Sequence, residues 1–101
     1  MKYFIIGDED SVLGFGMVGV EGKVAESAAD AEAAFSAALE AKDVGIVILT
    51  ERTADLIRRV VDAYVLSRRF PLVVEIPDRR GPLPGRRNIR EMVTDAIGIK
   101  L

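Results

Sequence analysis

The sequence contains no cysteine and no histidine. Without them the chain can form no disulfide, no zinc finger, no cysteine nucleophile and no histidine-based catalytic triad. Its 101 residues carry 14 basic and 16 acidic side chains, for a net charge of −2. General nucleic-acid binding needs a basic surface, so nucleic acid is not an expected partner. These absences exclude most familiar classes of enzyme.

Long apolar runs are also missing. The longest uncharged run, residues 11–20, is about half of what a membrane-spanning helix requires, and it holds three glycines. The apolar start of the chain leads straight into the acidic cluster Asp8–Asp10, and not into the small-residue cleavage site of a secretory signal. We therefore expect a soluble, cytoplasmic protein with no direct membrane insertion.

What the sequence does contain is a regular alternation of strand and helix patterns. Half of its residues are hydrophobic and 6% are aromatic, enough for one domain with a largely aliphatic core. Apolar runs and helical periodicities predict strands over 2–7, 22–26, 44–49 and 72–76, and helices that begin near 9, 27, 50 and 87. This order predicts an α/β fold of the receiver-like (flavodoxin-like) kind, with a four-stranded parallel sheet in the order 2-1-3-4.

The polar residues at the expected helix starts are typical N-caps. Asp8 is predicted to cap the first helix, Ser27 the second in a capping box with Asp30, and Thr50 or Thr53 the third. The third helix is expected to run unbroken, with salt bridges Asp55–Arg59 and Arg58–Asp62. Its apolar stripe consists of Leu56, Ile57, Val60, Val61, Tyr64 and Val65.

A change of composition divides the chain near residue 77. Residues 1–77 form the expected receiver-like domain, and 78–101 an Arg/Pro/Gly-rich hinge and a C-terminal helix, within a single domain overall. The hinge holds Arg79, Arg80, Arg86 and Arg87. With no aromatic side chain for base stacking, we expect this basic loop to be solvated or to face an acidic protein surface.

Charge is also distributed unevenly along the chain. Residues 1–50 hold nine acidic and three basic side chains, whereas 51–101 hold eleven basic and seven acidic ones. Such asymmetry is a weak indication of a charged partner.

Two motifs suggest catalytic or cofactor chemistry but lack its context. Gly14–Gly19 matches G-x-G-x-x-G, yet the glycines begin seven residues after the first strand, so close helix packing explains them better than a nucleotide. The acids Asp8–Asp10 resemble those that hold Mg²⁺ in phospho-accepting receiver domains. However, the third strand ends in Leu49-Thr50-Glu51, without the acceptor aspartate, and there is no fifth strand with its lysine. A cap with helix-dipole acids is the simpler interpretation.

Several segments together resemble the F subunit of the V/A-type rotary ATPases. The first runs from Ile6 to Phe15 and continues at Met17–Val20, where the family tends to read I-G-D-x-D-T-V-x-G-F-R-L-A-G. Further matches are residues 47–51, 71–77 and 96–99, so the resemblance covers the whole chain. Gly16 departs from the family, which usually has a basic residue there.

The resemblance implies a non-catalytic rotor part without cofactor or metal. The F subunit of this family binds the coiled-coil D subunit in the central stalk, which turns inside the catalytic A/B hexamer and reaches a membrane-ring adaptor. The chain would then be cytoplasmic and peripheral to the membrane, and it would help couple ATP hydrolysis or synthesis to ion transport. The alternative is a stand-alone receiver-like interaction module without phospho-acceptor chemistry.

The expected partner-binding residues lie on the predicted C-terminal helix. Its apolar stripe, with one neighbouring arginine, consists of Ile89, Arg90, Met92, Val93, Ala96 and Ile97. The isolated chain is expected to be a monomer, because no long apolar stripe should remain exposed once the sheet is covered.

Overall fold

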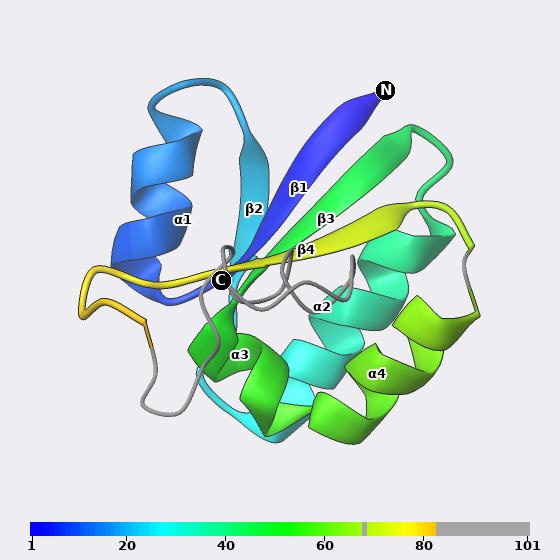
Figure 1. The fold of residues 1–101 in the computed structure, drawn as a ribbon. Coiled ribbons are helices and arrows are strands. Elements are labelled where there is room, and N and C mark those ends of the chain that lie inside the picture. The colour runs from blue at the N-terminus through cyan, green and yellow to red at the C-terminus, as the bar shows by residue number, and fades with distance from the viewer. Residues whose placement is uncertain (68, 83–101) are drawn as a thin grey trace, which may run out of the picture.

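A computed structural model describes residues 1–67 and 69–82 of the chain. Along the sequence run β1 (Lys2–Gly7), α1 (Glu9–Gly16), β2 (Glu21–Val24), α2 (Ala28–Glu40), β3 (Val44–Thr50), α3 (Glu51–Leu56), α4 (Arg58–Leu66) and β4 (Leu72–Ile76). The four strands form one parallel sheet in the order β2-β1-β3-β4, which confirms the predicted fold class and strand order (Figure 1). The predicted helix near 87–98 lies outside the described residues.

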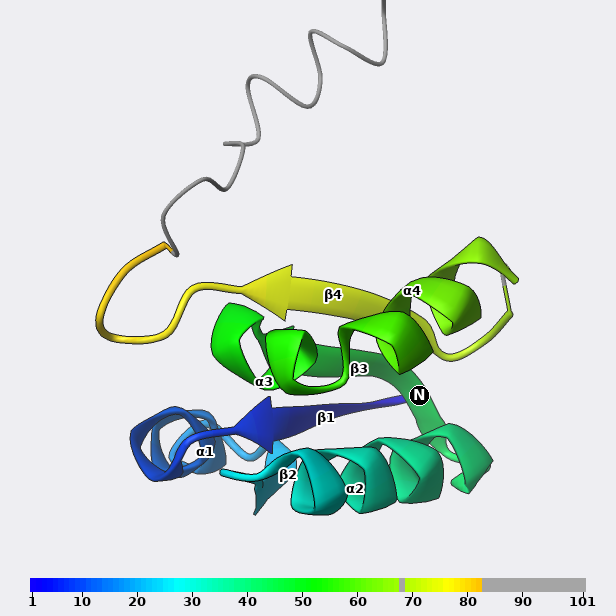
Figure 2. The ribbon, with the colours of Figure 1, turned by 90° about the horizontal axis from the view of Figure 1, so that it is seen from below.

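Helices lie on both faces of the sheet, but unequally. Helices α2, α3 and α4 pack side by side on one face, which we call the covered face, whereas α1 lies on the other, the open face (Figures 1 and 2). Right-handed connections explain this division: the chain turns back from β1 to β2 and then advances across the sheet to β3 and β4. The main core lies between the covered face and its three helices, and includes Ile6, Phe35, Val47, Leu49 and Val61.

Three predicted N-caps are confirmed by hydrogen bonds. The side chains of Asp8, Ser27 and Thr50 accept from the backbone N–H groups three residues on, at 3.1, 3.2 and 3.2 Å respectively. Each bond satisfies one of the N–H groups that a helix start leaves without an intrahelical partner. Of the two threonines considered for the third helix, Thr50 is therefore the cap.

The glycines of the G-x-G-x-x-G pattern do not mediate close packing, so that part of the prediction was wrong. A Cβ added to Gly14 or Gly16 would meet nothing within 4 Å among the described residues, because both lie on the outer side of α1. Gly19 has a different role: its φ of +89° ends α1, with its N–H bonded to Gly16 O and that of Val20 to Phe15 O, both 3.0 Å. This bonding pattern is a Schellman C-cap.

The third predicted helix is two helices, which corrects the expectation of an unbroken one. Ile57 takes φ −132° and ψ 39°, so α3 ends at Leu56 and α4 starts at Arg58. The break interrupts the helical periodicity, so Ile57 and Val61 are buried whereas Leu56, Val60 and Val65 are exposed. For the same reason Asp55 pairs with Arg58, at 2.6 Å, instead of with Arg59, while the predicted Arg58–Asp62 pair forms at 3.2 Å.

Candidate functional site

The carboxyl edge of the sheet, where ligands bind in many open α/β proteins, holds a cleft of about 520 Å³. It is formed where the chain leaves the four strands. The lining residues include Asp8, Asp10, Thr50, Arg52, Asp78, Arg79 and Arg80. The structure thus brings the acidic cluster after β1 together with the first arginines of the predicted basic loop.

Asp8 is engaged in capping α1. Its carboxylate accepts from the Ser11 N–H at 3.1 Å and from the Ser11 hydroxyl at 2.6 Å. Partial burial by itself would raise the pKa of Asp8, but these hydrogen bonds outweigh it and hold the pKa below its usual value. Both carboxylate oxygens therefore serve the helix start, as the capping interpretation predicts.

The end of β3 carries hydroxyl groups where a receiver domain has its phospho-acceptor. Thr50 Oγ1 accepts from the Thr53 N–H and donates to Thr53 Oγ1 at 2.8 Å, and both residues are buried. Within 1–67 and 69–82, no group of three or more carboxylate side chains is placed to hold a metal ion. At the end of β3 the chain thus presents the Thr50 hydroxyl where phosphoryl transfer in a receiver domain uses an aspartate.

Two ion pairs cross the cleft. Arg52 Nε lies 2.9 Å from Asp78 Oδ2, and Arg79 Nε lies 3.0 Å from Asp10 Oδ2. Each joins an acidic side chain to an arginine from another segment of the carboxyl edge. Arg79 and Arg80 lie in the turn after β4, whereas Arg86 and Arg87 lie outside the described residues. Part of the charge asymmetry along the sequence is thus used inside the molecule, because Arg79 from the basic half pairs with Asp10 from the acidic half.

The open face carries the largest exposed apolar side chains of the sheet. Tyr3, Ile46 and Leu72 lie in register across β1, β3 and β4, and neighbours in register point to the same side of a parallel sheet. Tyr3 is 51% exposed and Leu72 50%, and Val74, one step further along β4, is 44% exposed. Helix α1 packs mainly against β1 and β2, so it leaves the β3–β4 half open.

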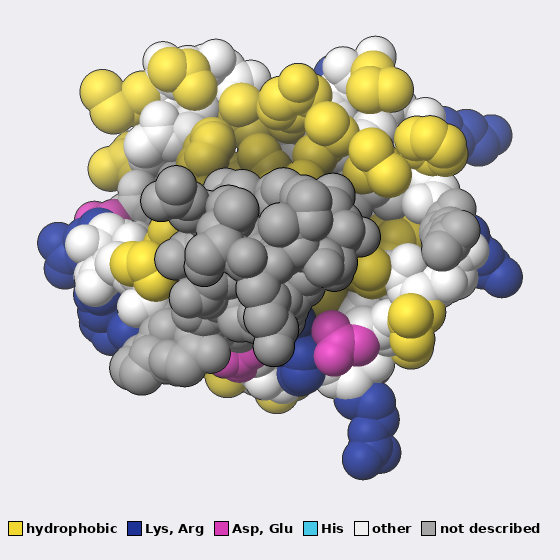
Figure 3. All heavy atoms as spheres, in the orientation of Figure 1, with side chains coloured by type: hydrophobic (Ala, Val, Ile, Leu, Met, Phe, Trp, Pro, Cys, Tyr) yellow, Lys and Arg dark blue, Asp and Glu magenta, His cyan; other side chains and the backbone are white. Residues whose placement is uncertain are grey.

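The outer side of α1 and its C-terminal turn extend this apolar surface. Leu13, Met17 and Val18 are all more than half exposed. Figure 3 shows hydrophobic side chains gathered along the upper part of the molecule, the side on which α1 lies. The expectation that no apolar stripe stays exposed, on which the predicted monomer depends, does not hold for this side of the described residues. Patches of this kind mark interaction surfaces in soluble proteins.

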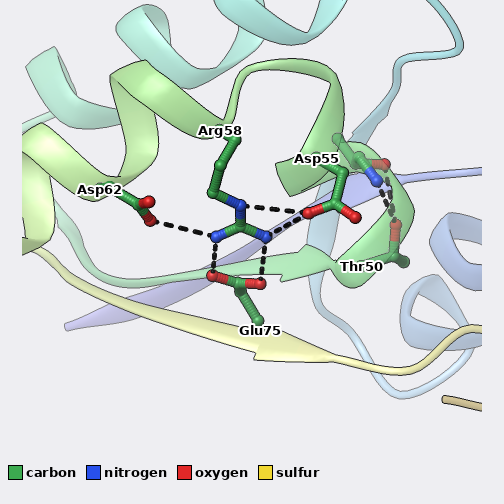
Figure 4. Close-up of polar contacts among 6 residues, drawn as sticks. Thr50, Asp55, Arg58, Asp62 and Glu75 are labelled. Atoms are coloured by element: carbon green, nitrogen blue, oxygen red, sulfur yellow. Dashed lines mark hydrogen bonds and ion pairs between the residues drawn. The ribbon is translucent and has the colours of Figure 1, made fainter. Parts of the chain in front are cut away.

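Sequence analysis missed a charged cluster between α4 and β4. The Arg58 guanidinium makes a bidentate pair with Glu75, at 2.7 and 2.8 Å, and also contacts Asp55 and Asp62 (Figure 4). The Glu75 hydrogen bonds are the largest cause of an Arg58 pKa raised above its ordinary value. Glu75 is the one charged residue of strand β4, and a carboxylate in an apolar strand was the available signal.

The remaining predicted site residues cannot be placed in this fold. Ile89, Arg90, Met92, Val93, Ala96 and Ile97 all lie outside the described residues. Among the helices of the described part, none is long and apolar enough to cross a bilayer.

Comparison with known proteins decides the family. The sequence model of the ATP synthase (F/14-kDa) subunit family matches residues 4–93. The chain belongs to this family. It is 34% identical to the F subunit of the A-type ATP synthase of Thermococcus kodakarensis and 35% identical to that of Pyrococcus furiosus; each comparison covers 100% of this chain and 98% of the relative. The corresponding F subunit of Methanothermobacter thermautotrophicus is 31% identical, over 96% of this chain and 92% of the relative.

The match extends beyond the receiver-like part of the fold. Because the relatives align from end to end, the residues after β4 are part of the family pattern too. The resemblance to the F subunit is therefore confirmed, and the chain is a non-catalytic subunit of an A-type ATP synthase. This membership favours a role in the synthase over that of a stand-alone interaction module.

Proposed function

We propose that the chain is a central-stalk subunit that binds a coiled-coil partner of type D through its C-terminal stripe and so helps couple the A/B hexamer to ion transport. Membership of the F-subunit family is the observation that carries this proposal. The stripe is Ile89, Met92, Val93, Ala96 and Ile97, at the spacing of one face of a helix, with Arg90 at its border. Such a helix can lay its apolar face against the helices of a coiled coil.

The carboxyl edge supports a binding role over a catalytic one. Asp8 caps a helix, the two threonines at the end of β3 bond to each other, and Asp10 and Asp78 each pair with an arginine. Meanwhile the apolar side chains of the open face remain exposed. The polar groups of the carboxyl edge are thus engaged in structural bonds, while apolar surface stays exposed on the open face. This combination is typical of a subunit that binds another protein.

A single charge on the predicted stripe tests the proposal. We expect Val93→Glu to weaken binding to the purified D-type subunit of the same organism at least about 30-fold, because a buried aliphatic anchor replaced by a charge costs about 2 kcal/mol or more. Thr94→Glu is the matched control, since it adds the same charge to the same predicted helix at a position outside the stripe. It should change the affinity less than about threefold.

Isothermal titration calorimetry of the full-length chains gives both affinities directly. If Val93→Glu bound the D-type subunit as tightly as the unchanged chain, the stripe would not be the docking surface. If the unchanged chain showed no binding at all, the proposed partner itself would be wrong.

A further inference from the structure

The turn after β4 is held together by hydrogen bonds among its own residues. Gly81 N–H donates to Asp78 O at 2.9 Å, and Asp78 and Gly81 form an isolated antiparallel bridge. Arg80 N–H donates to Asp78 Oδ1, also at 2.9 Å, and Gly81 takes a φ of +89° that favours glycine. Prolines on both sides, Pro77 and Pro82, restrict the backbone further. Residues 77–82 therefore form a conformationally restricted turn, which we call the exit turn.

The register of the sheet places this turn beside the start of α3. Thr50 of β3 lies opposite Ile76 of β4 in the parallel ladder. Arg52 and Asp78 each lie two residues further on, so their side chains meet above the carboxyl edge. The side chain of Asp78 is only 6% exposed, and its two carboxylate oxygens are divided between Arg52 Nε and the Arg80 N–H.

We infer that the Arg52–Asp78 ion pair clamps the exit turn to the sheet and thereby fixes the direction in which the chain leaves β4. Because the exit turn is conformationally restricted, the single contact between Asp78 and Arg52 is enough to limit its rotation about the end of β4. The pair from Arg79 to Asp10 adds a second tie to the start of α1, but both of its side chains are more than half exposed. Exposed pairs contribute little, so the shielded pair is the main clamp.

The clamp gives the carboxyl edge a positioning role in place of a catalytic one. It fixes the starting point of the segment after residue 82 relative to the helices of the covered face. That this orients the segment for a coiled-coil partner rests on the proposed function, whereas the clamp itself does not.

Hydrogen exchange in the full-length chain tests the clamp without any partner. We expect Arg52→Gln to lower the protection of the Arg80 and Gly81 amides about tenfold, because a charge-assisted hydrogen bond to a shielded carboxylate is lost while the turn residues stay unchanged. Asp10→Asn should lower it less than about threefold. Arg59→Gln, at an exposed arginine of α4, is the matched control and should leave the protection unchanged. Protection in Arg52→Gln within twofold of the unchanged chain would overturn the clamp.

A second measurement addresses the direction of the chain. The sequence has no cysteine, so spin labels can be placed uniquely at Ser36→Cys on α2 and at Arg80→Cys, an exposed position of the exit turn. Double electron–electron resonance should give one narrow distance distribution, which broadens when Arg52→Gln is added. A distribution equally wide with and without Arg52→Gln would refute the inference that the ion pair fixes the exit. Neither readout involves the D-type subunit, so failure here is distinguishable from failure of the proposed function.

Discussion

Adjacent residues of β4 show how differently side chains are buried on the two faces of this sheet. Val73 points to the covered face and packs against the main core, whereas Val74 points to the open face and is 44% exposed. The same contrast holds in β1, where Phe4 packs on the core and Tyr3 is 51% exposed. Among the described residues, three helices pack on one face, whereas α1 alone packs on the other, over β1 and β2.

The contrast separates two uses of apolar side chains. On the covered face they stabilise the fold, because burial removes them from water when the chain folds. On the open face Ile5 and Ile48 are buried as well, but Tyr3, Leu72 and Val74 remain 44–51% exposed and so gain less from folding. Substitutions on the two faces should therefore have different effects on stability.

The largest loss of stability is expected in the core of the covered face. Phe35 is fully buried and packs edge to face against Tyr64, with ring centroids 5.7 Å apart. We expect Phe35→Ala to lower the free energy of unfolding by about 3–5 kcal/mol, as for other large-to-small changes in cores. Urea unfolding followed by circular dichroism measures it.

The matched substitution on the open face is Leu72→Ala. Leu72 is 50% exposed, so its truncation should cost about 1 kcal/mol or less. Equal losses from Leu72→Ala and Phe35→Ala would show that the open face is covered in the folded chain, and the contrast between the faces would not hold.

An intermediate loss is expected for the charged cluster at the edge of the covered face. Arg58→Met keeps much of the side-chain volume but leaves Glu75, whose side chain is 26% exposed, without its bidentate partner. We expect a loss of about 1–3 kcal/mol in the free energy of unfolding. Arg59→Met, one residue further along α4, is the control and should stay within about 0.5 kcal/mol. A loss no larger than that of the control would mean that the cluster does not stabilise the α4–β4 contact.

The smallest effect concerns the helix of the open face and depends on pH. Hydrogen bonds from Ser11 hold the pKa of Asp8 below its usual value in the folded chain, so the unfolded chain binds the proton more readily. The resulting stabilisation is complete above about pH 4, the pKa region of an unfolded aspartate, and is lost as the pH falls through the folded value. Asp8→Asn keeps a capping side chain but removes this titration.

Urea unfolding between pH 7 and pH 3 checks this expectation. The unchanged chain should lose more stability on acidification than Asp8→Asn does. Asp43, whose pKa is lowered by its hydrogen bond with Lys2, contributes the same acid dependence in both proteins and so cancels from the comparison. Identical acid profiles would show that Asp8 contributes no pH-dependent stability to α1.

Local signals in the sequence were sufficient for the strand order and the caps. The alternation of apolar runs with capped helical patterns predicted β2-β1-β3-β4, and Asp8, Ser27 and Thr50 cap their helices as expected. These features depend on residues close together in the sequence, or on the handedness of short connections.

The features that were missed depend on contacts between distant segments. The pairing of Arg52 with Asp78 follows from the register of β3 against β4, and that of Arg58 with Glu75 from the packing of α4 beside β4. The residue pattern determines neither of them. The break at Ile57 could not be predicted either, because the helical spacing of apolar residues in the sequence continues across it. The open face could not be anticipated either, because the apolar runs of β1 and β3 indicate burial without showing which helices supply it.

The most direct test of the central claim is a pull-down of the tagged chain from solubilised membranes of its source organism, with the eluate assayed for ATP hydrolysis. The proposed central-stalk function predicts recovery of a large ATPase that contains a D-type stalk subunit in near-equimolar amount. Recovery of the chain alone, or together with a histidine kinase and no ATPase, would contradict the central-stalk assignment.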